Sequence, residues 1–341
     1  MGKYYKSDIL KNKSYWENMS PNELEYFKSQ IFYYYRFAGF PFYPTDKEYR
    51  DREFEKLINY DHSNVIVGDT IKQTMHGLAL AWSYFPHAYD VKCNNKLTPY
   101  EVFKDDEKFM KVIEKRLKMG TYISDSGILK MLKMFSNTQG VSNFRPTAAA
   151  AIYDKFAPNG IVWDMSGGWG GRMLGAIKSS VKQYIATEPS KKTFQGLFDL
   201  GHNYCGDTNI RLSMQGSEDY IPEKNSLDLC FTSPPYFDLE KYSNDRSQSY
   251  IKYPDINSWI NEFLGKTMEN CFYGLKSNKY MLINIADHKK SKISLEKATV
   301  EKAKQSGFHY EGRLKLALSN PNMKNRKSPF KYEPIFIFKK K

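Results

Sequence analysis

The sequence has 341 residues, enough to bury one large core or two smaller ones, so we expect a catalytic domain with an additional region. A formal net charge of +13 and a pI of about 9.2 favour a polyanionic partner over an acidic small molecule. The four cysteines lack paired spacing, and no apolar run approaches a membrane span. We therefore expect a reduced, cytoplasmic protein without a zinc site, a disulfide scaffold or a membrane anchor.

The first 140 residues are predicted to be mainly helical. Residues 20–23, Ser-Pro-Asn-Glu, form a capping box with proline at the first helical position, which predicts a helix that ends near Gly39. Residues 98–101 repeat this pattern and predict a helix that continues to Gly120. The apolar spacing predicts a third helix over residues 128–135.

From about residue 147 the pattern changes to alternating strands and helices, which is typical of a doubly wound α/β domain. Seven strands are predicted. The last two have no helix between them, which indicates a hairpin edge on a mostly parallel sheet. The expected strands cover residues 160–163, 183–187, 209–214, 227–231, 280–285, 310–318 and 332–338.

A glycine-rich loop follows the first predicted strand. Residues 164–172 read Asp-Met-Ser-Gly-Gly-Trp-Gly-Gly-Arg, a strand-to-helix turn in which a ligand can approach the backbone closely. The glycines alone are compatible with a nicotinamide or flavin cofactor, but the loop lacks the spacing of a dinucleotide fingerprint or a P-loop. Asp164 at the strand end repels phosphates and suits a cationic or amino-acid ligand, although it also fits a helix cap.

Acidic residues follow the next two predicted strands. Glu188 stands where an acid accepts hydrogen bonds from both hydroxyls of a ribose. The alternative interpretation is that Glu188 is an acidic residue on the protein surface. Glu218 and Asp219 lie in a polar segment near the same sheet edge, where an adenine amino group could be held. A simple polar turn explains these two residues equally well.

The fourth predicted strand ends in an unusual way. Thr232 is followed by Ser233, Pro234, Pro235 and Tyr236. The two prolines fix two φ angles and remove two N–H donors, which leaves backbone carbonyls beside a hydroxyl and an aromatic ring. A plain turn needs only one proline or glycine, so this end of a core strand indicates a site that accepts hydrogen bonds from an amino group.

These features resemble the S-adenosylmethionine-dependent amino methyltransferases of nucleic acids. The Ser-Pro-Pro-Tyr run at residues 233–236 is similar to their catalytic motif, and residues 164–170 are similar to their cofactor motif, with Met-Ser in place of the usual Pro-Phe. Residues 144–147, Phe-Arg-Pro-Thr, resemble the additional cofactor motif of the family, and residues 332–336 resemble its last strand. The resemblance covers residues 141–341 and none of residues 1–140.

The resemblance implies a Rossmann-like, seven-stranded methyltransferase sheet over residues 141–341, preceded by a mainly helical region over residues 1–140. It implies S-adenosylmethionine as cofactor and no metal. The implied catalytic residues are Ser233, Pro234, Pro235 and Tyr236. The expected cofactor-binding residues are Phe144, Arg145, Thr147, Asp164, Ser166, Gly167, Gly168, Gly170, Glu188, Glu218, Asp219 and Thr232.

The implied reaction is methylation of an exocyclic amino group on a base that has left the DNA duplex. The Ser233 hydroxyl and the Pro234 carbonyl would accept the two amino protons, so that the nitrogen lone pair can point at the sulfonium methyl, while Tyr236 stacks on the base. Serine at the first motif position favours N4 of cytosine over N6 of adenine. An RNA amino methyltransferase, a non-catalytic nucleic-acid-binding protein and, more weakly, a nicotinamide oxidoreductase are the alternatives.

The predicted strands and helices account for the length of the methyltransferase region, which leaves no insertion for a large target-recognition domain. We therefore expect residues 1–140, which include a basic cluster at residues 111–118, to supply DNA binding. The loop at residues 238–246 and the basic run at residues 324–327 are expected to help. A modification system or a phage is the expected source, with or without a restriction partner.

Overall fold

The structure is a computed structural model, and it describes residues 9–237, 239–242, 244–287, 293–318 and 330–341. It forms two compact units. The helical unit comprises Met1–Pro44 and Pro86–Val141, and the sheet unit comprises Thr45–Phe85 and Ser142–Lys341. This division differs from the single boundary near residue 140 that the sequence predicts, because Thr45–Phe85 packs within the sheet unit. The basic run at residues 324–327 lies outside the described residues, as do residues 238 and 243 of the predicted loop.

The helical unit forms the helices that the capping boxes predict. The Glu23 backbone N–H donates to the Ser20 hydroxyl at 3.4 Å and the Glu23 carboxylate accepts from the Ser20 N–H at 2.8 Å. The equivalent bonds of Thr98 and Glu101 are 3.0 and 2.8 Å long. The elements of this unit are a 3₁₀ turn Lys13–Tyr15, α2 (Pro21–Ala38), a 3₁₀ turn Pro86–Asp90, β3 (Lys92–Cys93), α5 (Pro99–Lys104), α6 (Asp106–Met119) and α7 (Asp125–Lys133).

The predicted helix from residue 99 to Gly120 is broken at Asp105. This residue has an extended backbone, and its carboxylate accepts from the Lys108 backbone N–H at 2.9 Å, which starts α6 as a new helix. The buried side of α6 includes Phe109 and Val112, which belong to an aromatic-rich core shared with α2, α5 and α7.

The sheet unit contains a nine-stranded sheet, two strands more than the sequence predicts. Its order is β1-β2-β10-β11-β9-β7-β4-β5-β6. The two additional strands are very short and come from the N-terminal part of the unit, where the sequence gives no strand pattern. The strands are β1 (Ile66–Val67), β2 (Thr70–Ile71), β4 (Ile161–Asp164), β5 (Gln183–Thr187), β6 (Asn209–Ser213), β7 (Leu227–Thr232), β9 (Leu275–Asn284), β10 (His309–Ala317) and β11 (Tyr332–Lys339). A further short strand, β8, spans Glu240–Lys241.

Strands β6, β5, β4, β7 and β9 are parallel to one another, and β11 is antiparallel to both β9 and β10. The predicted hairpin of the last two strands is therefore confirmed. Its second strand, β11, inserts between β9 and β10, and β2 pairs with the other side of β10. The chain thus has a mixed α/β, Rossmann-like fold, as the sequence predicts.

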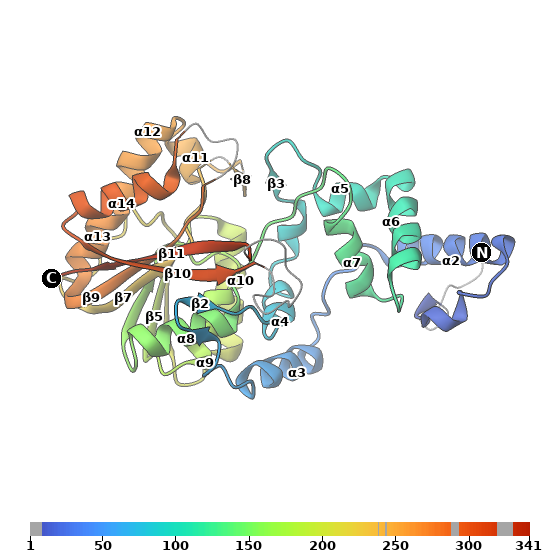
Figure 1. Ribbon diagram of the computed structural model, residues 1–341, viewed down its shortest axis with the longest axis horizontal. Helices are drawn as coiled ribbons and strands as arrows, with labels where there is room; N and C mark the ends of the chain where they lie inside the picture. Colours follow the sequence, from blue (N-terminus) through green and yellow to red (C-terminus); the bar gives the residue numbers. More distant parts are fainter. Residues whose placement is uncertain (1–8, 238, 243, 288–292, 319–329) are drawn as a thin grey trace. The chain divides into compact units, whose positions relative to one another are not determined.

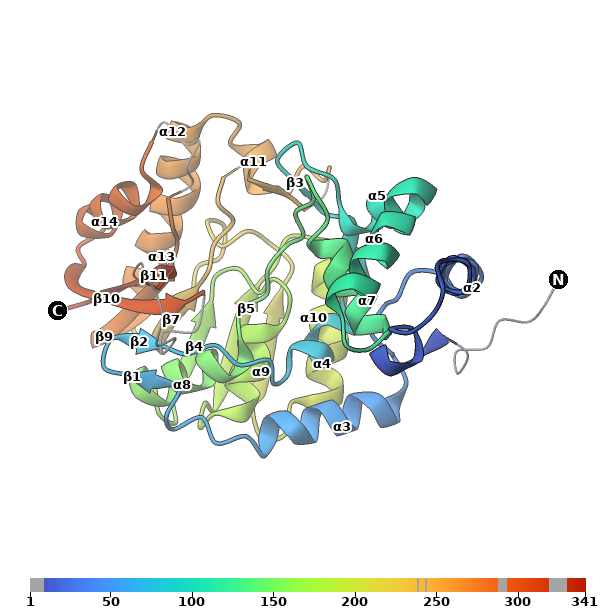
Figure 2. The same ribbon diagram turned by 45° about the vertical axis from the view of Figure 1, so that its right-hand side comes forward.

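Helices cover both faces of this sheet (Figures 1 and 2). Helices α8, α9 and α10 lie on one face, and α13 and α14 lie on the other, where they bury a core that includes Trp163, Trp259 and Phe338. The helices of the unit are α3 (Lys47–Ile58), α4 (Leu78–Trp82), α8 (Pro146–Phe156), α9 (Gly171–Lys178), α10 (Lys191–Tyr204), α11 (Ser249–Lys252), α12 (Ile256–Ser258), a π-helical segment Trp259–Gly265, α13 (Lys266–Gly274) and α14 (Leu295–Gln305).

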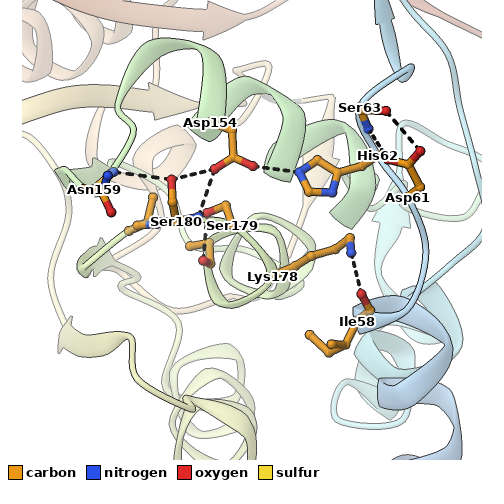
Figure 3. Close-up of polar contacts among 11 residues, drawn as sticks. Ile58, Asp61, His62, Ser63, Asp154, Asn159, Lys178, Ser179 and Ser180 are labelled. Atoms are coloured by element: carbon orange, nitrogen blue, oxygen red, sulfur yellow. Dashed lines mark hydrogen bonds and ion pairs between the residues drawn. The ribbon is translucent and has the colours of Figure 1, made fainter.

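The N-terminal part of the sheet unit is attached to α8 and α9 by polar contacts (Figure 3). The Asp154 carboxylate on α8 bonds to His62 Nε2 at 2.7 Å and accepts from the Ser180 backbone N–H at 2.9 Å. The Lys178 ammonium donates to the Ile58 carbonyl at 2.9 Å. These contacts hold the segment that follows α3 beside the ends of α8 and α9.

Candidate active site

The sheet changes its winding direction between β4 and β7. From β4 the chain proceeds through β5 to β6 on one side, and from β7 it proceeds to β9 on the other. Ligands of open α/β sheets bind outside the carboxyl ends of the strands at such a switch point. The segments that follow β4 and β7 are the glycine-rich loop and the Ser-Pro-Pro-Tyr run. The topology therefore brings the two motifs singled out in the sequence to one place.

Asp164, the last residue of β4, is completely buried and bonded within the protein. Its Oδ1 accepts from the Thr232 hydroxyl at 2.8 Å and from the Ser166 N–H at 3.2 Å. Its Oδ2 accepts from Arg172 Nε at 2.8 Å and from the Tyr184 hydroxyl at 2.6 Å. Its carboxylate thus joins the ends of β4 and β7 and the Tyr184 side chain of β5 to the glycine loop and α9. A direct contact of Asp164 with a cofactor stays a prediction.

Arg172, in the first turn of α9, is the cation that compensates Asp164. It is buried, and its guanidinium also donates to the Ser166 carbonyl of the loop. Burial lowers the pKa of Arg172, but the Asp164 carboxylate, together with the nearby Tyr184 and Tyr153 hydroxyls, outweighs burial and holds the pKa above its ordinary value. We did not single out Arg172 from the sequence. The sequence signal was a cation in the first turn of a helix. The positive end of the helix dipole makes a cation there unfavourable unless an anion lies nearby.

The glycine loop is held against the neighbouring strand and against the chain before α8. The Gly167 N–H donates to the Thr187 carbonyl at 2.9 Å, and Gly168 adopts a left-handed backbone with φ of 56°. A Cβ on Gly171 would lie 2.0 Å from the Phe144 carbonyl oxygen, so only glycine fits there. Ser166 and Gly168 are the partly exposed residues of this otherwise buried loop.

Glu188 is buried directly after β5, beside the glycine loop. Its Oε2 accepts from the Gly168 N–H at 3.1 Å and its Oε1 accepts from the Ser190 N–H at 2.9 Å. Burial raises the pKa of Glu188 to about 7, although these two backbone bonds act in the opposite direction. The carboxyl group is therefore close to its titration midpoint at neutral pH.

The residues before and within the start of α8 contact both the site and the N-terminal part of the sheet unit. The Phe144 ring packs edge-on against Phe231 of β7, with 5.2 Å between ring centroids. Arg145 donates to the Gln73 side-chain oxygen at 3.2 Å. The Thr147 hydroxyl lies 2.7 Å from the Thr74 hydroxyl. The predicted cofactor residues of this segment are thus braced by Gln73 and Thr74, which sequence reasoning missed because no local pattern marks them.

Glu218 and Asp219, which follow β6, share a lysine from α11. The Lys252 ammonium lies 2.9 Å from Glu218 Oε1 and 2.6 Å from Asp219 Oδ2. Burial lowers the pKa of Lys252, but its bonds to Asp219 and Glu218 outweigh burial and raise it. Glu218 is buried, and its Oε2 has no hydrogen-bond partner among the described residues, whereas Asp219 is exposed. Glu218 therefore has an acceptor available for a ligand.

The Ser-Pro-Pro-Tyr run begins directly after Thr232. Pro234 is buried, while Ser233, Pro235 and Tyr236 are partly exposed. No hydrogen bond to the Ser233 side chain occurs in the described part of the chain. The Tyr236 hydroxyl donates to the Asn284 carbonyl at 3.4 Å. The run thus presents a hydroxyl and an anchored aromatic ring at the switch point.

Among the described residues, no group of three or more histidine, cysteine, aspartate or glutamate side chains is placed to hold a metal ion. Cys230 is buried inside β7, and burial raises the pKa of the neighbouring Cys271 thiol. Within the same described ranges, no helix has both the length and the apolar character needed to span a membrane.

No protein-family model and no curated protein matches the sequence. Solved structures with a similar fold include a methyltransferase from Pyrococcus furiosus, with 18% identity and a TM-score of 0.39 over 55% of this chain and 80% of that chain. An S-adenosylmethionine-dependent O-methyltransferase from Thermotoga maritima is 11% identical, with a TM-score of 0.39 over 59% of this chain and 68% of that chain. The cyclase SpnF is 9% identical, with a TM-score of 0.41 over 58% and 84% of the two chains. Similarity at this level does not identify the reaction of this chain.

Proposed function

We propose that this protein transfers a methyl group from S-adenosylmethionine to an exocyclic amino group of a base flipped out of DNA, with N4 of cytosine as the favoured target. The observation that carries the proposal is the placement of the Ser-Pro-Pro-Tyr run and the glycine loop at one switch point. Thr232 and Asp164 join the two segments by a 2.8 Å hydrogen bond. The proposal also includes N6 of adenine as the alternative target.

The residues around the glycine loop fit S-adenosylmethionine. The buried Glu218 Oε2 lacks a partner among the described residues and can accept from the adenine amino group. The Glu188 carboxyl lies beside the loop, where its oxygens can accept from the ribose hydroxyls. Ser166 and Gly168 expose loop atoms to the remainder of the cofactor. When bound, the cofactor supplies an electrophilic methyl group on a sulfonium ion.

The protein side of the reaction is hydrogen bonding and positioning. An exocyclic amino nitrogen is a weak nucleophile because its lone pair is delocalised into the base. If the Ser233 hydroxyl and the Pro234 carbonyl accept its two protons, the nitrogen moves toward tetrahedral geometry and directs its lone pair out of the ring plane. Tyr236, anchored on the Asn284 carbonyl, stacks on the base and fixes this orientation.

We assign DNA binding and target recognition to the helical unit. Lys111 and Lys118 on α6 and Lys130 on α7 are exposed. None of these three forms an ion pair with an acidic side chain in the described part of the unit. Exposed aromatic rings on α2, Tyr26 and Phe37 among them, add stacking surfaces. The evenly spaced phosphates of DNA would pair with these lysines.

Methyl transfer from labelled S-adenosylmethionine to unmethylated, PCR-amplified DNA and to RNA of the same sequence tests the reaction. We expect incorporation into DNA, with N4-methylcytosine as the product in nucleoside analysis. Transfer only to RNA would show that DNA is not the substrate. Detection of N6-methyladenine in place of N4-methylcytosine would show that adenine, and not cytosine, is the target base. Cofactor binding without transfer to either polymer would favour the non-catalytic alternative.

Salt dependence of DNA binding tests the role of the helical unit. The triple variant K111E/K118E/K130E should bind DNA more weakly and with a shallower dependence on salt concentration. The matched control, K182E/K224E/K304E, changes three exposed lysines of the sheet unit and should behave like the unchanged protein. Equal losses in the two triple variants would contradict the assignment. Truncation is a poor test, because removing residues 1–130 also removes Thr45–Phe85 from the sheet unit.

A further inference from the structure

The backbone around Glu218 is fixed by α13. The buried Asn270 side chain donates to the Glu218 carbonyl at 3.0 Å and to the Ser217 carbonyl at 3.2 Å. The Ser217 hydroxyl lies 2.7 Å from the Thr267 hydroxyl, which is also on α13. Because these contacts hold the main chain, the direction of the Glu218 carboxylate depends on the groups that contact its two oxygens.

Lys252 holds one of these two oxygens. Its ammonium donates to Glu218 Oε1 at 2.9 Å and to Asp219 Oδ2 at 2.6 Å. The hydroxyl of the next residue, Tyr253, lies 3.5 Å from the same Glu218 oxygen. The Glu218 side chain is 3% exposed, and the Lys252 side chain is 35% exposed. Oε1 therefore has its partners within the protein, whereas Oε2 has no hydrogen-bond partner among the described residues.

Gly216 provides the space for the second oxygen. A Cβ on Gly216 would lie 2.2 Å from Glu218 Oε2, so the carboxylate lies directly against the backbone of this glycine. Gly216 is partly exposed, and a group that approaches across it can reach Oε2. A buried carboxylate oxygen without a hydrogen bond is costly, since the water that it has lost is not replaced. A donor on a ligand would remove this cost.

The position of Lys252 does not depend on its ion pairs alone. It is the last residue of α11, which begins at Ser249. The Ser249 hydroxyl accepts from Nε1 of the buried Trp259 at 3.2 Å. Phe237, directly after the Ser-Pro-Pro-Tyr run, packs edge-on against the Trp259 ring with 6.0 Å between the centroids. The segment that follows the run is thus anchored at Trp259 and brings Lys252 to the acids that follow β6.

We propose that Lys252 positions the Glu218 carboxylate so that Oε2 accepts a hydrogen bond from the 6-amino group of the cofactor's adenine. This role rests on the proposed function, because it assumes that S-adenosylmethionine binds beside the glycine loop. Lys252 is then a positioning residue that acts through Glu218. Together the two residues select adenine over a purine that lacks the amino group.

The chemistry at position 6 of the purine explains this selection. Adenine presents an N–H donor there, whereas hypoxanthine presents a carbonyl oxygen, and two facing acceptors repel each other. A hydrogen bond to an ionised acceptor is also stronger than one to a neutral acceptor. Lys252 keeps the Glu218 carboxylate paired and oriented. Without Lys252 this buried carboxylate lacks its cation, so neither its charge nor its direction is maintained.

The binding of two non-reactive cofactor analogues tests this role. S-adenosylhomocysteine carries the 6-amino group, and S-inosylhomocysteine carries a 6-oxo group in its place. By calorimetry, the unchanged full-length protein should bind S-adenosylhomocysteine roughly 10- to 150-fold more tightly, the effect of one hydrogen bond to a charged group. Lys252→Met should bind S-adenosylhomocysteine more weakly and lower this ratio severalfold. Lys252→Arg keeps the cation and should restore most of the ratio.

A second variant disturbs the same carboxylate and leaves Lys252 in place. In Gly216→Ala the added Cβ would displace Glu218 Oε2, so the ratio should fall here as well. Lys266→Met is the matched control, because Lys266 pairs with Glu269 at 3.0 Å on the exposed side of α13. Its affinities for both analogues should equal those of the unchanged protein. Thermal unfolding of each variant ensures that folded proteins are compared.

The outcomes distinguish this inference from the proposed function. If the unchanged protein binds neither analogue, the proposed function fails, and the role of Lys252 fails with it. If the unchanged protein binds both analogues equally, or if Lys252→Met weakens both by the same factor, Lys252 does not position an acceptor for adenine. The proposed function then still stands on methyl transfer to DNA. A lower ratio in Lys252→Met and Gly216→Ala, with Lys266→Met unchanged, supports the positioning role.

Discussion

The Thr232 hydroxyl donates a 2.8 Å hydrogen bond to Asp164 Oδ1, and both residues are buried. Thr232 immediately precedes Ser233, and Asp164 immediately precedes the glycine loop. One bond therefore sets the position of the proposed amino-group site relative to the proposed cofactor site. Its loss should affect the geometry between the two sites as well as the stability of the protein.

Thr232→Val tests this bond, because valine keeps the shape and removes the hydroxyl. We expect the free energy of unfolding to fall by about 1.5–3 kcal/mol, the usual contribution of a hydrogen bond to a charged group. Urea unfolding measures this change. Thr232→Ser retains the hydroxyl and should lose less. If valine and serine destabilise the protein equally, the lost methyl packing, and not the bond to Asp164, explains the effect.

Arg172→Leu should destabilise the protein strongly. The substitution leaves the buried Asp164 carboxylate without its cation, which typically costs about 3–5 kcal/mol. Arg211→Leu, at an exposed arginine of β6, serves as control and should change the stability by less than about 0.5 kcal/mol. Denaturant midpoints at pH 7 provide the comparison. Similar midpoints for the two variants would show that the ion pair contributes little.

Glu188 should make the stability of the protein depend on pH. The pKa of its carboxyl is about 7 in the folded protein and near 4.5 in the unfolded chain, so the folded state retains a proton that the unfolded state releases. Stability is therefore highest below about pH 4.5 with respect to this group and falls as the pH rises to about 7. The total change is on the order of 3 kcal/mol.

Glu188→Gln removes the titrating group and should flatten this part of the pH profile. Thermal or urea unfolding of both proteins between pH 4.5 and 8 isolates the contribution of Glu188 as the difference between the two curves. If the stability of the two proteins depends on pH in the same way, the pKa of the Glu188 carboxyl is not raised by folding.

Ser233→Ala should lower kcat for methyl transfer by roughly 10²-fold and leave S-adenosylmethionine binding nearly unchanged. The hydroxyl matters in the transition state, when the amino proton must be accepted, and it is not part of the expected cofactor contacts. Single-turnover kinetics and calorimetry give the two quantities. Ser226→Ala, before the opposite end of β7, is the control. A loss of cofactor affinity as large as the loss of turnover would contradict the assigned role.

Much of the sheet could be predicted from the sequence, because its strands are apolar runs separated by capped helices. The predicted strand at residues 183–187 coincides with β5, and the one at residues 227–231 is one residue shorter than β7. Strands β1 and β2 were missed because each has two residues and β2 depends on pairing with β10. Helix α3 was missed as well, although Asp46 caps it by accepting from the Tyr49 N–H at 2.8 Å.

The candidate site could be predicted as two motifs but not as one network. Glycines and prolines mark local backbone geometry, which the sequence reveals directly. The partners of Asp164 come from different elements. Arg172 lies eight residues away, whereas Tyr184 lies 20 and Thr232 lies 68 residues away. Such a set depends on tertiary packing. Because these partners come together only in the folded protein, the sequence indicated that Asp164 binds a ligand. It did not reveal that four groups of the protein itself donate hydrogen bonds to its carboxylate.

The pairing of β2 with β10 also determines when the sheet unit can be completed during synthesis. Thr70 is opposite Lys315, and 245 residues separate them. At a translation rate of about 5–20 residues per second, β2 has been made roughly 12–50 s before its partner exists. The helical unit, whose last residue is Val141, can form during that interval. Other contacts of Thr45–Phe85, such as those of Ile58 and His62 with α9 and α8, can form earlier, so within this segment it is β2 that waits for its partner strand.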